Sequence, residues 1–150
     1  MEKGFQDLHS VLRYVIILLF VYTIVRYVNG LRGKKEFTSA DDKASLFLTI
    51  SLDIQLLLGL VMYFFTSVWK DVPIVMSDPI VRFYKVEHIT GMIIAIALAH
   101  IGKVMMKKKT DSADKFKTGL IYFIISLVII LATIPWPFRS NLGGSWFPGT

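Results

Sequence analysis

Four apolar blocks, separated by short polar connections, constrain this chain more than any other feature of its sequence. The most telling block is residues 120–136, which contains no charged side chain. The other blocks are residues 8–28, 46–65 and 89–101. A helix needs about 20 mainly apolar residues to cross roughly 30 Å of hydrocarbon. Charged residues make up only 19% of the chain, which argues against a soluble domain.

We therefore expect an all-α fold, an integral membrane four-helix bundle that forms one domain over residues 1–150. Its helices should cover approximately residues 8–29, 40–67, 79–107 and 116–135. Asp78 followed by Pro79 predicts the start of the third helix. Residues Ser39 to Asp42 form a capping-box pattern before the second helix, and Pro135 should end the fourth. The first block is too long for a signal-peptide core and lacks a small-residue cleavage site, so we expect it to be retained.

Basic residues predict the orientation of the bundle. Eleven of the 17 Lys and Arg residues lie in or beside the first and third connections, and six lie on the other side. Because basic residues concentrate on the cytoplasmic side, both termini should face outward, toward the periplasm of a bacterial inner membrane. Trp69, Trp136 and Trp146 fall on this outer side, as interfacial anchors would. The net charge of +6 then reports orientation, and we expect no nucleic-acid partner.

Polar side chains inside the apolar blocks are the candidates for function, because they are costly in a membrane. The chain has no cysteine, which excludes disulfides, thiolate metal sites and iron–sulfur clusters. It also lacks a glycine-rich phosphate loop and a zinc-protease helix motif. The remaining candidates are His9, Arg13, Asp53, Gln55, Glu87, His88 and His100.

His9 and His88 should lie at a similar depth, because the first and third helices both enter from the outer side. Imidazoles from two facing helices are what the iron of a b-type haem needs as axial ligands. Arg13 follows His9 by four residues, on the same helix face, and could pair with a haem propionate. Gly59 and Gly91 would leave room for the edge of the macrocycle.

Other interpretations of the same residues stay open. An interfacial histidine is commonly a hydrogen-bonding residue, Arg13 could be an anchor or a partner of Glu87, and the glycines could be helix-packing positions. Met92 lies four residues after His88 and, with both histidines, would make a soft copper site.

Asp53 and His100 should reach a similar depth nearer the inner side. His100 lies roughly 18 Å along its helix from His88, so one haem cannot bind both. An Asp53–His100 pair, joined by Arg26, could neutralise itself in the bundle or pass protons to a quinone.

Several stretches resemble the short four-helix membrane proteins of Bacteroidetes that are commonly labelled cytochrome b or cytochrome-b-like. These stretches are residues 8–13 (LHSVLR), 54–60 (IQLLLGL), 78–83 (DPIVRF), 86–88 (VEH) and 134–139 (IPWPFR). The resemblance covers nearly the whole chain and implies haem binding. Relatives often carry His where this chain has Asp53, which leaves His9 and His88 as the implied ligand pair.

The leading hypothesis is a b-type cytochrome or cytochrome b-like subunit that holds one haem and exchanges electrons between the quinone pool and a partner subunit. We expect no independent enzymatic activity, because the connections are short. The alternatives are a membrane scaffold or assembly subunit without haem and a periplasm-facing copper-handling protein. A homo- or hetero-oligomer is compatible with each hypothesis.

Overall fold

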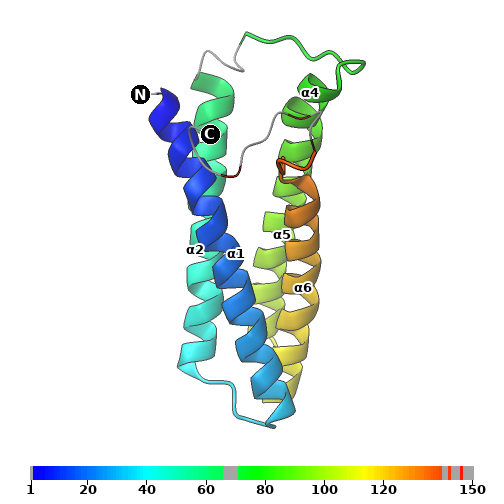
Figure 1. Cartoon of the computed structure of the whole chain (residues 1–150). Helices are drawn as coiled ribbons and strands as arrows, with labels where there is room; N and C mark the ends of the chain where they lie inside the picture. Colours follow the sequence, from blue (N-terminus) through cyan, green and yellow to red (C-terminus); the bar gives the residue numbers. More distant parts are fainter. Residues whose placement is uncertain (1, 66–70, 140–141, 143–145, 147–150) are drawn as a thin grey trace.

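The structure, a computed structural model, describes residues 2–65, 71–139, 142 and 146 of the chain. Four helical rods pack side by side along a common direction (Figure 1), and the described residues include no strand. The elements are α1 (Glu2–Arg32), α2 (Ser39–Phe65), α4 (Pro79–Arg82), the π-helical segment η1 (Phe83–Glu87), α5 (His88–Lys107) and α6 (Ser112–Thr133).

Each rod is long and apolar enough to cross a membrane. The candidate spans are Lys3–Arg32, Ser39–Phe65, Pro79–Lys107 and Ser112–Thr133. The third span consists of α4, η1 and α5 together. The apolar block at residues 89–101 is too short to cross a membrane by itself, so the helix had to begin earlier. Large apolar side chains cover the outer surface of the bundle, including Leu18, Leu57 and Val128, each more than half exposed. We therefore treat the chain as a multi-pass membrane protein.

Capping residues in the sequence predicted the starts of two helices. Asp78 is the N-cap of α4 as expected, and its carboxylate accepts hydrogen bonds from the backbone N–H groups of Ile80 and Val81. The second helix also begins as expected, but its cap lies one residue earlier than the Ser39 pattern indicated. Asp41 accepts hydrogen bonds from both the N–H and the hydroxyl of Thr38.

The first and fourth spans, α1 and α6, differ more from their expected bounds. α1 begins at Glu2 rather than near residue 8, because the polar first residues continue the helix beyond the apolar block. α6 begins at Ser112 rather than near 116, because Asp111 accepts a hydrogen bond from the N–H of Asp114 as an N-cap. It ends at Thr133, two residues before Pro135. The expected end of the second helix at 67 and the anchor Trp69 lie outside the described residues.

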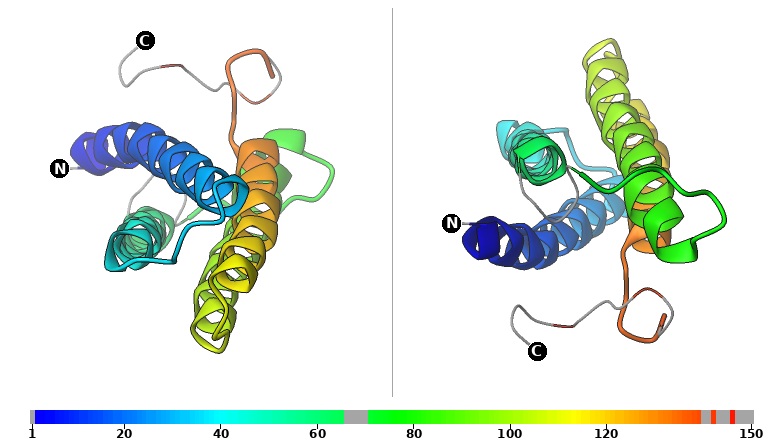
Figure 2. Two further views of the ribbon diagram at one scale, coloured as in Figure 1. Left: turned by 90° about the horizontal axis from the view of Figure 1, so that it is seen from below. Right: turned by 90° about the horizontal axis from the view of Figure 1, so that it is seen from above.

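The largest fully buried side chains lie in the half of the bundle that carries the α1–α2 and α5–α6 connections. Phe20, Tyr27, Phe116 and Phe123 are fully buried or nearly so, and the Tyr27 ring lies 5.5 Å from that of Phe116. α1 crosses the bundle obliquely and diverges from α6 toward its own N-terminal end (Figure 1; Figure 2). This divergence leaves room at the opposite end, between the α1–α2 pair and the α5–α6 pair.

Candidate functional site

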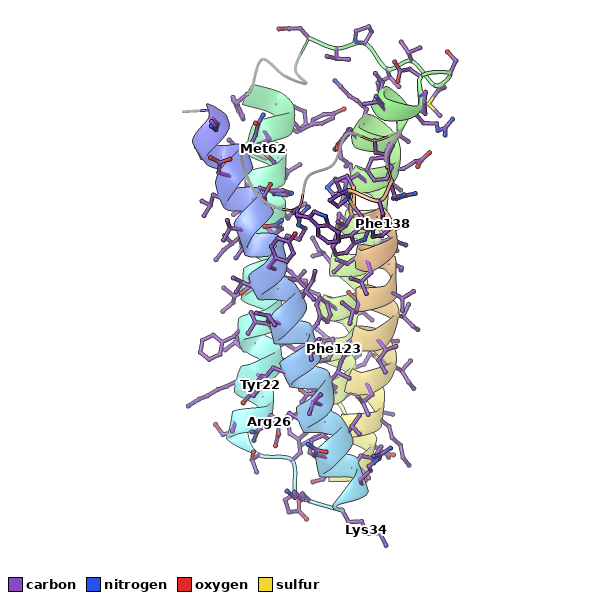
Figure 3. All side chains as sticks on the ribbon, viewed as in Figure 1. Tyr22, Arg26, Lys34, Met62, Phe123 and Phe138 are labelled. Atoms are coloured by element: carbon purple, nitrogen blue, oxygen red, sulfur yellow. The ribbon has the colours of Figure 1, made fainter. Side chains whose placement is uncertain are left out.

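A cavity of about 390 Å³ lies at that opposite end, and all four spans line it. Its walls are mainly apolar, with a few polar groups from three of the spans, which is the usual character of a small-molecule site. Met62, labelled near the top of α2 in Figure 3, belongs to this lining. The polar lining residues are Gln6, His9, Ser10, Arg13, Gln55, Tyr63, Tyr84 and His88.

His9 from α1 and His88 from α5 meet at this cavity. Their ring centroids are 6.4 Å apart, and the ring planes are inclined by 67°. The structure therefore brings together the two histidines that the sequence analysis placed at one depth.

The ring of His88 is fixed by a backbone carbonyl. Nδ1 of His88 lies 2.7 Å from the carbonyl oxygen of Thr133 on α6. A carbonyl only accepts, so Nδ1 carries the proton, and Nε2 of a neutral ring keeps its lone pair. Metal-binding histidines are commonly oriented in this way by a hydrogen bond from the other ring nitrogen.

A π-helical segment immediately precedes His88. η1 covers Phe83–Glu87, so the wider π turn ends directly before the histidine. Such segments shift the register of the side chains that follow, and they are frequent at functional sites. Neither this segment nor the Thr133 contact was expected, because neither leaves a pattern in the sequence.

His9 is positioned through its backbone and keeps an unused ring nitrogen. Gln55 Nε2 donates to the His9 carbonyl at 3.0 Å. Nδ1 of His9 is buried and has no hydrogen-bond partner among the described residues. Gly59 faces this ring, since a Cβ at that position would lie 3.4 Å from His9 Cε1. Glycine on α2 therefore leaves space beside the imidazole.

Arg13 brings a cation to the same cavity, and no other Lys or Arg is among the described residues that line it. Its Nη2 lies 3.4 Å from both the Tyr14 hydroxyl and the Trp146 carbonyl. Its Nε is buried without a partner in the described part of the chain. The alternative pairing with Glu87 is not made, because Glu87 accepts from Arg82 at 2.7 Å. Arg13 thus offers an unused donor to an anionic group in the cavity.

Two further cations at this end lie over aromatic rings. Nζ of Lys85 lies 4.9 Å from the centre of the Tyr63 ring, and Cζ of Arg139 lies 5.1 Å from the centre of the Phe83 ring.

Gly91 and Met92 are adjacent but have different surroundings. Gly91 is absent from the cavity lining and faces α6, where an added Cβ would collide with the Thr133 side chain. Its contribution is therefore to let α6 approach α5 closely, which places the Thr133 carbonyl beside His88. Met92 does line the cavity, together with both histidines.

Asp53, near the middle of α2, and His100 on α5 form a pair of their own outside the cavity lining. Asp53 Oδ1 lies 2.8 Å from His100 Nε2. Arg26 does not join them, contrary to expectation, because its Nε bonds to the buried Asp41 at 2.6 Å. Asp41 belongs to the cap of α2, beside the α1–α2 connection, so it attracts the arginine there.

A cluster of three or more His, Asp or Glu side chains that could hold a metal ion does not occur in the described ranges. A metal at the cavity would therefore depend on two histidines with a further donor from a cofactor or from Met92. Comparisons of the chain with protein-family models, with curated proteins and with solved structures found no match.

Proposed function

We propose that this chain is a b-type haem protein of a bacterial inner membrane, with His9 and His88 as the axial ligands of one haem b. The separation of the two rings carries the proposal. An imidazole nitrogen binds a transition metal at about 2 Å, so two imidazoles on opposite sides of one ion have centroids roughly 6 Å apart. The observed separation is 6.4 Å.

Three further observations support a haem at this cavity. His88 keeps Nε2 available because Nδ1 donates to Thr133. Buried polar atoms at His9, Arg13 and Gln55 lack partners within the described residues, as expected where a ligand completes the site. Gly59 leaves open the space beside His9.

The protein would contribute position and charge to electron transfer. A bound haem supplies one-electron redox chemistry, whose potential depends on its ligands and surroundings. His88 would be held in one orientation by Thr133, and Arg13 would balance a propionate. The apolar walls would keep water away from the iron. A quinone in the bilayer and a membrane redox subunit are the proposed electron partners.

We also propose that the cavity lies in the outer half of the membrane. The α1–α2 and α5–α6 connections hold Lys34, Lys35 and the run Lys107 to Lys109 at the other end of the bundle, which favours that end as cytoplasmic. A phosphatase reporter fused after residue 150 should be active, because this enzyme functions only in the periplasm. An inactive phosphatase, with an active cytoplasmic reporter at the same site, would reverse the orientation.

The experiment that tests haem binding is the reduced-minus-oxidised absorption spectrum of the purified full-length chain. We expect a b-type α-band that is lost in His9→Ala and in His88→Ala. His100→Ala is the matched control, because this histidine lies away from the cavity, and its band should be unchanged. A colourless protein that co-purifies with a larger complex would favour the scaffold hypothesis. Copper without haem would favour a site formed with Met92.

A further inference from the structure

The Asp53–His100 pair is partly open to the surroundings of the bundle. Asp53 on α2 and His100 on α5 keep 48% and 44% of their side-chain surfaces exposed. The seam between α2 and α5 thus presents an ionisable pair on the outside of the molecule rather than in its core.

The pair lies at the depth of the hydrocarbon. His100 precedes the end of α5 at Lys107 by seven residues, which is about 10 Å along the helix. Asp53 lies 14 residues after the start of α2 at Ser39, or about 21 Å. Both positions are inside a span that must cover roughly 30 Å. Ionisable groups at this depth rarely face lipid, because no water is present to solvate them.

Each member of the pair has one polar atom left over. The two side chains are bonded through Oδ1 and Nε2, and a pair inside the hydrocarbon is least costly when it carries no net charge. In a pair without net charge, whichever side chain holds the shared proton, the Nδ1–H of His100 remains a donor and Oδ2 of Asp53 an acceptor. Neither atom has a hydrogen bond to any other described residue. Lys103, one turn further along α5, differs because its Nζ already donates to the Asp42 carbonyl and carboxylate and to the Ser45 hydroxyl.

The surface around the pair is apolar and includes one small residue. Leu57 and Val104 follow Asp53 and His100 by four residues each, on the same faces, and are 63% and 54% exposed. The small residue Ala97 is also exposed on α5. Small residues beside polar ones let helices of neighbouring molecules approach and form hydrogen bonds.

We propose that the α2–α5 seam is the interface of a two-fold symmetric homodimer in the membrane. One donor and one acceptor per chain make the seam self-complementary, as an isologous interface requires. In the dimer, His100 of each copy donates from Nδ1 to Asp53 Oδ2 of the other, so all four side chains are satisfied. This inference uses no property of the haem cavity and stands independently of the proposed function.

Single cysteines test the interface, because the natural chain has none. Leu57→Cys and Val104→Cys should give dimers with a short bifunctional maleimide in native membranes. Leu18→Cys on α1 and Val128→Cys on α6 are matched controls, since these residues are 68% and 59% exposed but lie on other helices. Equal cross-linking at all four positions, or none at Leu57→Cys and Val104→Cys, would overturn the proposal.

A second measurement tests the contribution of the pair itself. Single-molecule photobleaching of the labelled full-length chain in dilute liposomes gives the monomer–dimer equilibrium. Asp53→Leu and His100→Leu should each weaken dimerisation at least tenfold. The exchanged variant Asp53→His with His100→Asp should restore it, because the same donor and acceptor are present in reversed places. A monomeric wild-type chain, a heteromer with another protein, or a dimer insensitive to these changes contradicts the proposal.

Discussion

The three histidines of the chain differ in what their rings contact, and these contacts separate their roles. His88 donates to the Thr133 carbonyl, His9 has a buried nitrogen without a partner in the described structure, and His100 lies beside a carboxylate. Their positions along the predicted helices indicated that His9 and His88 would meet. The orienting contact of His88 could not be predicted, because its acceptor is a backbone oxygen that any residue at position 133 would supply.

Arg13 gives the most direct prediction at this scale. Arg13→Gln should weaken haem binding by about tenfold to a hundredfold, because a hydrogen bond to a charged group contributes roughly 1.5–3 kcal/mol. Arg13→Lys should lose less, since it keeps the charge but not the fork of donors. Titration of the apoprotein with haemin measures both. Arg139→Gln is the control, as Arg139 lies over Phe83 outside the described cavity lining, and an equal loss there would remove the special role of Arg13.

At the scale of the helices, the third span contains a π-helical segment, η1, between the α-helices α4 and α5. The Asp78–Pro79 start was predictable because capping follows from local residue types. The π turn at Phe83–Glu87 was not, because its stability depends on packing against the other helices. The position of α6 against α5 depends in turn on Gly91 and Gly102, where added Cβ atoms would meet Thr133 and Tyr122.

These two glycines form a matched pair of tests. Gly91→Ala and Gly102→Ala should each lower the free energy of unfolding by about 1–3 kcal/mol, the usual cost of overpacking a tight contact. Only Gly91→Ala should also weaken haem binding, because it moves the Thr133 carbonyl away from His88. Thermal unfolding in detergent, together with haemin titration, separates the two effects. Equal haem affinity in both variants would show that the Thr133 contact does not orient the ligand.

At the scale of the whole molecule, hydropathy predicted four spans because each must be continuously apolar to cross the membrane. The cavity needed the structure, since it arises from the oblique course of α1 relative to α6 (Figure 2). The similar depth of His9 and His88 follows from their positions in the sequence, but their separation of 6.4 Å does not. Depth alone also predicted that Arg26 joins Asp53 and His100, because it does not reveal that the buried Asp41 binds this arginine instead.

The central claim is that the helices α1 and α5 hold one haem iron between His9 and His88. Electron paramagnetic resonance of the oxidised protein tests it most directly, because two imidazole ligands give low-spin ferric haem. We predict a low-spin signal in the wild type and in His100→Ala, and conversion to high-spin haem or loss of haem in His9→Ala and in His88→Ala. A wild-type protein that binds no haem, or a low-spin signal that survives either of these two substitutions, would contradict the account.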